Sequence, residues 1–257
     1  MSQAMTSVLK PRPEHVGLAA VLLLSSAAGL ALVAFRLLYS GTGGYAFMPW
    51  NLLLAWVPLV LALAIGPASH LGDGRPLALG ALGLLWLLFF PNAPYLLTEF
   101  IHLDPHYAVS RRPIRALAGL SPGGGVPVWY DVVLILTFAW NGLLLAFVSL
   151  HVVQRAVTRA AGSAWGWATV VLVLGLSGFG VSLGRFERWN SWDLFARPFT
   201  LLADVASRVL NPIEHARTTA VTVLLFSFLL LAYLSVTTLA AALPARAQEE
   251  GAPDYLG

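Results

Sequence analysis

The chain has 257 residues, of which 58% are hydrophobic and only 11% are charged, and its formal net charge is +3. Soluble domains carry about 25% charged residues, so a chain this apolar lacks the side chains to cover itself with a hydrated surface, and we exclude a soluble globular fold. Cysteine is absent and the arginines are dispersed, which excludes disulfides, thiolate metal sites, cysteine nucleophiles and a basic face for nucleic acid.

Six apolar segments follow one another along the chain, each near the ~20 residues that a helix needs to cross a bilayer. We predict spans at 16–38, 50–66, 77–90, 131–153, 165–183 and 218–243. The second and third are the shortest, and Pro58 is expected to kink the second. The predicted fold is all-α, a polytopic transmembrane helical bundle of about six spans, in a single domain over 16–243 between polar tails at 1–15 and 244–257.

Two connections between spans are long, 91–130 and 184–217, and alternating spans place both on the same side of the membrane. The arginine count does not decide which side this is, so the orientation stays open. Within the second connection, 198–210 separates apolar from polar side chains at helical spacing. Its apolar face carries Phe199, Leu202, Ala206 and Val209. We predict a short amphipathic helix there, lying flat in the membrane interface.

The first long connection opens within the run 89–103, which holds Tyr95, Glu99 and His102. Spacings of four and three residues place these side chains on one face if the segment is helical. A positioned imidazole or carboxylate is a candidate general base, so Glu99 and His102 are candidate catalytic residues. The simpler interpretation is a helix end whose polar side chains face water.

The same spacing raises the question of a metal. A glutamate followed three residues later by a histidine occurs in carboxylate-bridged metal sites of helical bundles, and Asp104 and His106 follow closely. Such sites pair the motif with a second copy, and we find none in the sequence. The metal, like any cofactor, therefore stays unknown.

The second long connection begins with 184–193, where two arginines flank a carboxylate and two tryptophans follow. Arginine recognises phosphate through paired hydrogen bonds and tryptophan suits headgroup depth, so we predict a site for an anionic lipid or a phosphorylated headgroup. The candidate ligand-binding residues are Arg185, Glu187, Arg188, Trp189, Asn190, Trp192 and Asp193. The structural alternative is a capping box from Asn190 to Asp193 that starts a helix.

Asp131 opens the fourth predicted span. Aspartate at such a position commonly complements the positive end of a helix. The functional alternative groups it with Glu99 and Glu187 on the long-loop side, which makes Asp131 a third candidate catalytic residue. We also predict that Glu99 and Arg185 share one polar cluster, because an unpaired charge at a bilayer boundary is costly.

Four polar stretches, 89–103, 129–131, 138–142 and 184–193, resemble the signature of a bacterial family of integral membrane proteins designated DUF1361, a domain of unknown function. The likeness begins near Trp50 and runs into the sixth span, whereas the tails and the loop 111–127 depart from it. It implies a multi-pass protein of the bacterial plasma membrane. It also marks Asn92 and Tyr95 as further candidate ligand-binding residues, but it implies no reaction.

Several function classes remain open on these grounds. The first is an integral membrane protein of unknown activity with a polar cluster on the long-loop side, which includes a scaffold without chemistry. The second is a membrane-embedded enzyme acting on a lipid-linked or phosphorylated substrate. The third is a small-solute transporter, favoured by the break at Pro91 and Pro94, because discontinuous helices line translocation sites. The expected partners are the lipid bilayer and an anionic headgroup, and no nucleic acid is expected.

Overall fold

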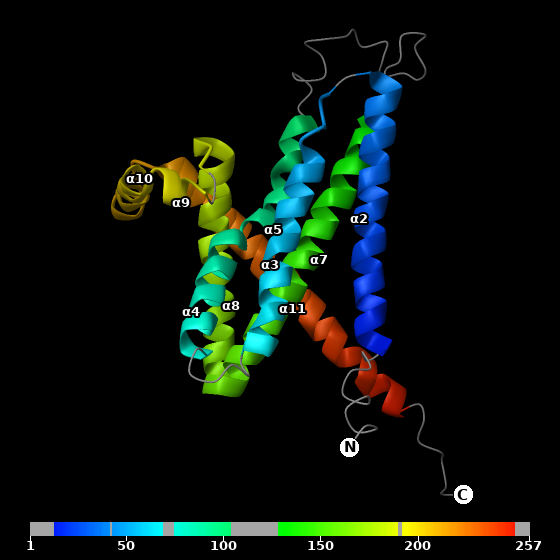
Figure 1. The fold of residues 1–257 in the computed structure, drawn as a ribbon, viewed down its shortest axis with the longest axis vertical. Helices are drawn as coiled ribbons and strands as arrows, with labels where there is room; N and C mark the ends of the chain where they lie inside the picture. Colours follow the sequence, from blue (N-terminus) through cyan, green and yellow to red (C-terminus); the bar gives the residue numbers. More distant parts are fainter. Residues whose placement is uncertain (1–12, 42, 69–74, 104–127, 190–191, 250–257) are drawn as a thin grey trace, which may run out of the picture. The chain divides into compact units, whose positions relative to one another are not determined.

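A computed structural model describes residues 13–41, 43–68, 75–103, 128–189 and 192–249. Over these residues the chain is helical and contains no strand, which confirms the predicted all-α fold (Figure 1). Six of the described helical segments are long and apolar enough to cross a membrane. They are Val16–Ser40, Met48–Gly66, Arg75–Leu103, Trp129–Ala161, Ser163–Glu187 and Ala216–Ala242. Each overlaps one predicted span, in the same order.

The chain divides into two compact units, Met1–Val153 and Gln154–Gly257. The division falls inside the long helix α7 (Val128–Ala161), and each unit is described by itself below. Two predicted features, the polar tail as far as residue 12 and the loop 111–127, lie outside the described residues.

The described part of the first unit consists of helices. These are α2 (Pro13–Ser40), α3 (Met48–Ala68), α4 (Arg75–Phe89), α5 (Asn92–Tyr95), the 3₁₀ helix η1 (Leu96–Leu103) and the first part of α7. Helix α3 packs along α4 and contacts α5, η1 and α2 (Figure 1). Because α3 touches every one of these neighbours, it is the element against which the candidate site of this unit is built.

Buried hydrogen bonds join the helices of the first unit across its apolar interior. Ser26 of α2 accepts hydrogen bonds from Asn141 Nδ2 of α7 at 2.8 Å and from Trp56 Nε1 of α3 at 3.1 Å. Ser149 of α7 accepts one from Trp86 Nε1 of α4 at 2.7 Å. Inside an apolar bundle such bonds select which helices are neighbours, so they fix the order of α2, α3, α4 and α7.

The third apolar stretch is broken near its C-terminal end. Helix α4 ends at Phe89, because Pro91 and Pro94 lack the N–H groups that would continue its hydrogen bonds. The single turn α5 follows, and the chain then tightens into η1. Asn92 Nδ2 donates to the Phe89 carbonyl oxygen at 2.9 Å and so satisfies an acceptor left at the end of α4.

The described part of the second unit contains the remainder of α7 and the C-terminal helices. These are α8 (Ser163–Ser182), the π-helical turn η3 (Leu183–Glu187), α9 (Asp193–Ala196), α10 (Pro198–Leu210) and α11 (Ala216–Glu249). Helices α8 and α11 pack closely, since a Cβ on Gly178 would lie 2.8 Å from the Thr222 carbonyl oxygen. Helix α11 continues to Glu249, so the tail predicted from residue 244 begins as helix, in keeping with its good helix formers.

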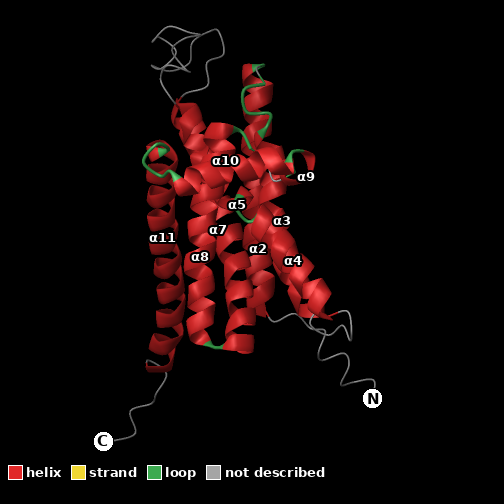
Figure 2. Cartoon of the chain, turned by 90° about the vertical axis from the view of Figure 1, so that its left-hand side faces the viewer, coloured by secondary structure: helices red, strands yellow, loops and turns green. Residues whose placement is uncertain are grey.

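The amphipathic helix predicted at 198–210 is present as α10 with the same bounds. In Figure 1, α8 is seen from the side while α10 is seen nearly end-on, and Figure 2 shows the length of α10 after a quarter turn. Helix α10 therefore crosses α8 instead of extending it. Its location in a membrane interface stays a prediction at this point.

Candidate functional site

Glu99 of η1 is the most completely buried charged side chain described in the first unit, with a relative exposure of 0%. Asn51 of α3 donates a hydrogen bond from Nδ2 to Glu99 Oε1 at 2.9 Å. A buried carboxylate is stable only where hydrogen bonds replace its lost hydration. The contact between α3 and η1 therefore supplies the partner that allows Glu99 to point into the bundle.

His102 is the second member of this site, three residues further along η1. Its Nδ1 lies 3.1 Å from Glu99 Oε2 and 3.1 Å from the Glu99 carbonyl oxygen. The 3₁₀ winding causes this approach, because side chains at i and i+3 eclipse in such a helix. The ring packs on Phe47, with centroids 5.0 Å apart, and the side chain is 25% exposed. The pair thus joins a buried carboxylate to an imidazole that reaches the surface of the unit.

The backbone around this pair is held by small and polar residues. A Cβ on Gly142 of α7 would collide with the Ala93 carbonyl oxygen and lie 3.0 Å from Leu96 Cβ, so only glycine allows α7 to approach the start of η1. Thr98 Oγ1 donates to the Tyr95 carbonyl oxygen at 2.7 Å. Of the candidate ligand-binding residues, Asn92 and Tyr95 are therefore seen in contacts that shape the turn.

Asp131, the third candidate catalytic residue, forms an ion pair that the sequence analysis did not predict. Arg36 of α2 donates from Nε to Asp131 Oδ1 at 2.7 Å and from Nη2 to Oδ2 at 3.2 Å. The two side chains are mostly buried, 16% and 14% exposed. A two-point pair of this kind is strong and directional, so it fastens the end of α2 to the start of α7.

Tyr45 lies next to this ion pair, in the connection between α2 and α3. The Arg36 guanidinium lies over its ring, 5.4 Å from the centroid. Burial raises the pKa of the Tyr45 phenol well above its ordinary value, and the Asp131 carboxylate adds to the rise. The phenol is therefore neutral across the physiological range and acts as a packing and hydrogen-bonding group.

In the second unit, the predicted 184–193 motif lies where α8 ends. The helix widens into the π-helical turn η3, and Arg188 then adopts a left-handed backbone conformation with φ 61°. Glu187 Oε2 pairs with Arg208 Nη2 of α10 at 3.0 Å. A side chain outside the predicted motif is thus a principal partner of its carboxylate.

Arg208 also connects to Asp204 and to the start of α11. Its Nε donates to Asp204 Oδ1 and Oδ2 at 3.1 Å, and its Nη1 donates to Thr218 Oγ1 at 2.9 Å. Trp189 Nε1 donates to Asp204 Oδ2 at 2.8 Å. Burial alone would raise the pKa of Asp204, but the hydrogen bonds from Arg208 and Trp189 outweigh it and lower the pKa below its ordinary value. We call Glu187, Trp189, Asp204, Arg208 and Thr218 the clamp.

The remaining candidates of the motif surround α9. Asp193 is the first residue of α9 and accepts a hydrogen bond from Arg197 Nη2 at 3.1 Å. Trp192 stands at the N-cap, so Asp193 does not occupy the third helical position that a capping box from Asn190 requires. Asn190 itself lies outside the described residues. The Arg197 guanidinium lies over the Trp189 ring, 5.2 Å from its centroid.

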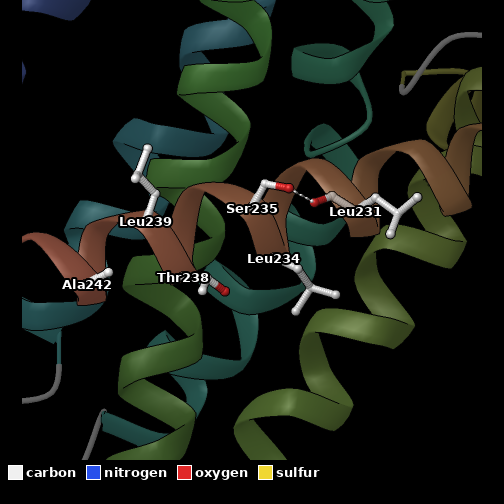
Figure 3. Close-up of a pocket in the computed structure, with 6 residues that line it drawn as sticks. All are labelled: Leu231, Leu234, Ser235, Thr238, Leu239 and Ala242. Carbon is white, nitrogen blue, oxygen red and sulfur yellow. Dashed lines mark hydrogen bonds between the residues drawn. The ribbon is translucent and has the colours of Figure 1, made fainter.

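The described residues contain no group of three or more His, Asp or Glu side chains placed to hold a metal ion. Asp104 and His106, named as neighbours of the predicted metal motif, fall outside those residues. Figure 3 shows a groove along α11 lined by Leu231, Leu234, Ser235, Thr238, Leu239 and Ala242. The Ser235 hydroxyl there donates to the Leu231 carbonyl oxygen at 2.8 Å, so the groove is an apolar helix surface without evident chemistry.

Comparison with known proteins identifies the family to which the chain belongs. Residues 50–233 match the family described as a protein of unknown function, DUF1361, and this range is well over half of the chain. The chain belongs to the DUF1361 family. No match was found among curated proteins or among solved structures. Asn51, Glu99 and His102 of this DUF1361 protein all lie inside the matched range, whereas Arg36 precedes it.

Sequence reasoning missed three residues of these sites in the DUF1361 protein: Asn51, Arg36 and Arg208. Asn51 carried a usable signal, because a lone amide inside an apolar span usually bonds another helix. Arg36 and Arg208 looked like ordinary basic residues at helix ends. Glu99 belongs to the first unit and Arg185 to the second, so the predicted pairing of these two side chains stays a prediction.

Proposed function

We propose that this DUF1361 protein is a multi-pass membrane protein of a bacterial plasma membrane. The six apolar helices support this, as do the large side chains that they expose, such as Leu63 and Leu172. Such helices satisfy their own backbone and are stable in lipid. The protein should stay in the membrane fraction through a carbonate wash and dissolve only in detergent, and its release into the wash would overturn the proposal.

The proposed crossings also fix which segments share a compartment. Reporters fused after Gly43, Gly124 and Asn211 should all report one side, and reporters after Ser69, Thr158 and the C-terminus should report the other. A split within either group would show that one apolar helix does not cross the membrane. The second and third helices would be tested first, because their predicted spans are the shortest.

For the activity, we propose that the Glu99–His102 pair acts as a general base in an enzyme. The observation that carries this is a fully buried carboxylate placed 3.1 Å from Nδ1 of a partly exposed imidazole. With Nδ1–H donating to the Glu99 carbonyl oxygen, the other ring nitrogen, Nε2, is the basic atom. The Glu99 carboxylate, with Oε2 at 3.1 Å from Nδ1, stabilises the imidazolium that forms when Nε2 takes a proton. His102 would take the proton of a hydroxyl or water that attacks the substrate.

The substrate class that we propose is lipid-linked or phosphorylated. Two features support it: the pair sits at the end of an apolar helix, and the 184–217 connection is rich in arginine and tryptophan, side chains suited to phosphate and to headgroup depth. Within the second unit, Arg197 has a side chain that is 62% exposed, so its guanidinium is accessible to an anionic group. Asp131 is given a structural role, because Arg36 engages both of its carboxylate oxygens.

The test uses the purified full chain in vesicles that contain phosphate-radiolabelled lipids extracted from bacterial membranes. We expect release of water-soluble labelled phosphate compounds, slowed roughly 10²–10⁴-fold in His102→Gln, the range typical for loss of a general base. Glu249→Ala, near the C-terminus and far along the sequence from the pair, serves as the matched control and should keep the full rate. No release by the unaltered chain, or a full rate in His102→Gln, would overturn the proposed enzyme.

Transport is the second candidate function, favoured by the break between α4 and η1. Discontinuous helices place backbone groups and charged side chains at translocation sites, and here the break precedes a buried carboxylate. A proton-coupled transporter would move solute into sealed vesicles in response to a pH gradient, and Glu99→Gln would abolish this uptake. Lipid turnover without such uptake would favour the enzyme.

A further inference from the structure

Helix α10 is amphipathic, but its apolar side faces outward and its charged residues face the rest of the unit, whereas a surface helix of a soluble protein does the reverse. Its half-buried residues include Leu201, Asp204, Val205 and Arg208, which recur at helical spacing and face the second unit. Its opposite side exposes large apolar side chains, with Phe199 at 85% exposure. None of its residues is fully buried. The charged groups of α10, Asp204 and Arg208, thus point inward while much of its apolar surface points away from the unit.

The clamp determines this orientation. Arg208 of α10 bonds Glu187 at the end of η3 and Thr218 near the start of α11, and Asp204 accepts the Trp189 indole. Rotating α10 to bury its apolar side would break all of these contacts together. The outward apolar side is therefore built into the fold of the unit and is not a loose helix that awaits packing.

The segments on either side of α10 determine its depth relative to a bilayer. It follows the apolar segment Ser163–Glu187 and precedes the apolar segment Ala216–Ala242. If both segments cross a bilayer, the chain between them starts and ends at the same boundary. Because α10 crosses α8 instead of extending it (Figures 1 and 2), it lies along that boundary.

We propose that the outer face of α9 and α10 docks into the lipid bilayer, at the boundary between headgroups and acyl chains. We define this outer face by Phe195, Phe199, Leu202, Val209 and Leu210, all exposed. The inference rests on the membrane placement proposed above and is independent of the general-base chemistry. Arg197 lies between α9 and α10 and has an exposed guanidinium. If the apolar side chains of the outer face enter the acyl-chain region, this guanidinium can bind a headgroup phosphate next to them.

The absence of cysteine makes a direct test possible, because single cysteines can be labelled without altering native thiols. Leu202→Cys on the outer face and Thr200→Cys on the other side of α10 form a matched, exposed pair. Each full-length variant would carry a polarity-sensitive fluorophore in vesicles of phosphatidylcholine and phosphatidylglycerol. We expect iodide in the water to quench the label at 202 several-fold less than the label at 200. Lipids brominated near the top of the acyl chain should quench the label at 202.

Two results would overturn the docking proposal. Equal iodide quenching at 202 and 200 would place the outer face in water. Protection of 202 from iodide without quenching by brominated lipid would show that a protein surface, such as a second copy of the chain, covers it. Leu224→Cys, in the apolar segment of α11, separates these failures from a failure of the membrane placement itself. A label there that is quenched by iodide and not by brominated lipid would refute the crossing helices.

Discussion

The buried carboxylate of η1 and the two carboxylates of the clamp are held in different ways. In the first unit, Glu99 is fully buried, and its partners include the Asn51 amide and the His102 imidazole. In the second unit, Glu187 and Asp204 remain partly exposed and share the Arg208 guanidinium. An imidazole next to a carboxylate can act as a proton acceptor or donor. A guanidinium keeps its proton and its charge, so it serves to hold a carboxylate in place.

This difference distinguishes a candidate reactive site, the Glu99–His102 pair, from a structural contact, the clamp. The imidazole paired with Glu99 is the group to which we assign the proposed acid–base chemistry of the first unit. The clamp keeps its charges and joins η3, α10 and α11 into one arrangement. Residues of the same types, named together as one cluster from the sequence, therefore serve different purposes in the two units.

The largest expected effect comes from removing the buried carboxylate. Glu99→Ala leaves the half-buried Asn51 amide without its acceptor and opens a cavity at the fully buried Glu99 position, which together should cost about 3 kcal/mol of unfolding free energy. An SDS unfolding titration of the purified protein measures this loss. Glu249→Ala should leave the curve unchanged. A Glu99→Ala protein as stable as the parent would mean that the buried site is not integral to the first unit.

The next effect concerns the approach of α7 to the start of η1. Gly142→Ala places a methyl group against the Ala93 carbonyl oxygen, which has no flexible end that can move aside. Overpacking of this kind costs typically ~1–3 kcal/mol, and it should also lower any activity that depends on the Glu99–His102 geometry. Gly80→Ala in α4 is the control, because no atom lies within 4 Å of its added Cβ. Equal melting temperatures for the two variants would contradict the close approach.

A smaller effect is expected at the ion pair between α2 and α7. A double-mutant cycle of Arg36→Ala and Asp131→Ala should give a coupling free energy of about 1 kcal/mol, because the pair is mostly buried and makes two contacts. If Asp131 only fastens the helices, Asp131→Asn should keep most of the activity. Loss of activity in Asp131→Asn at unchanged stability would instead show that Asp131 takes part in the reaction.

The smallest effect is a pH dependence at the clamp. The pKa of Asp204 is lower in the folded protein than its ordinary value of 3.8, so ionised Asp204 contributes stability above 3.8 that is lost as the pH falls through the folded pKa. Melting temperatures of the parent and of Asp204→Asn should therefore differ by a constant amount at neutral pH and converge at strongly acidic pH. A gap that widens on acidification would show that the pKa is raised.

The sequence predicted the helices well because hydropathy and the residues that start or stop a helix are local properties of the chain. Pro198 at the start of α10 and Asn211 with Pro212 after its end marked that helix to the residue. The Glu99–His102 pair was also visible, since its spacing of three residues is a local property. Only the winding differs, because Leu96–Leu103 is a 3₁₀ helix and not an α-helix.

Long-range partners could not be predicted in the same way. Arg36 and Asp131 are 95 positions apart, and no pattern near either residue specifies the other. The bond from Asn51 to Glu99 depends on how α3 lies against η1, which follows from packing and not from the composition of either segment. The close approaches that glycine allows are equally long-range, since Gly178 lies against α11 and Gly142 against the turn at Ala93.

The 3₁₀ geometry of η1 makes the pairing of Glu99 with His102 conditional on backbone twist. Three residues span a full turn in a 3₁₀ helix but roughly 60° less than a full turn in an α-helix. Rewinding Leu96–Leu103 as α-helix would therefore swing the imidazole sideways from the carboxylate and shorten the segment by about 4 Å. The distance between the two side chains therefore depends on helical pitch, and a ligand that favours one pitch over the other would bring the pair together or separate it.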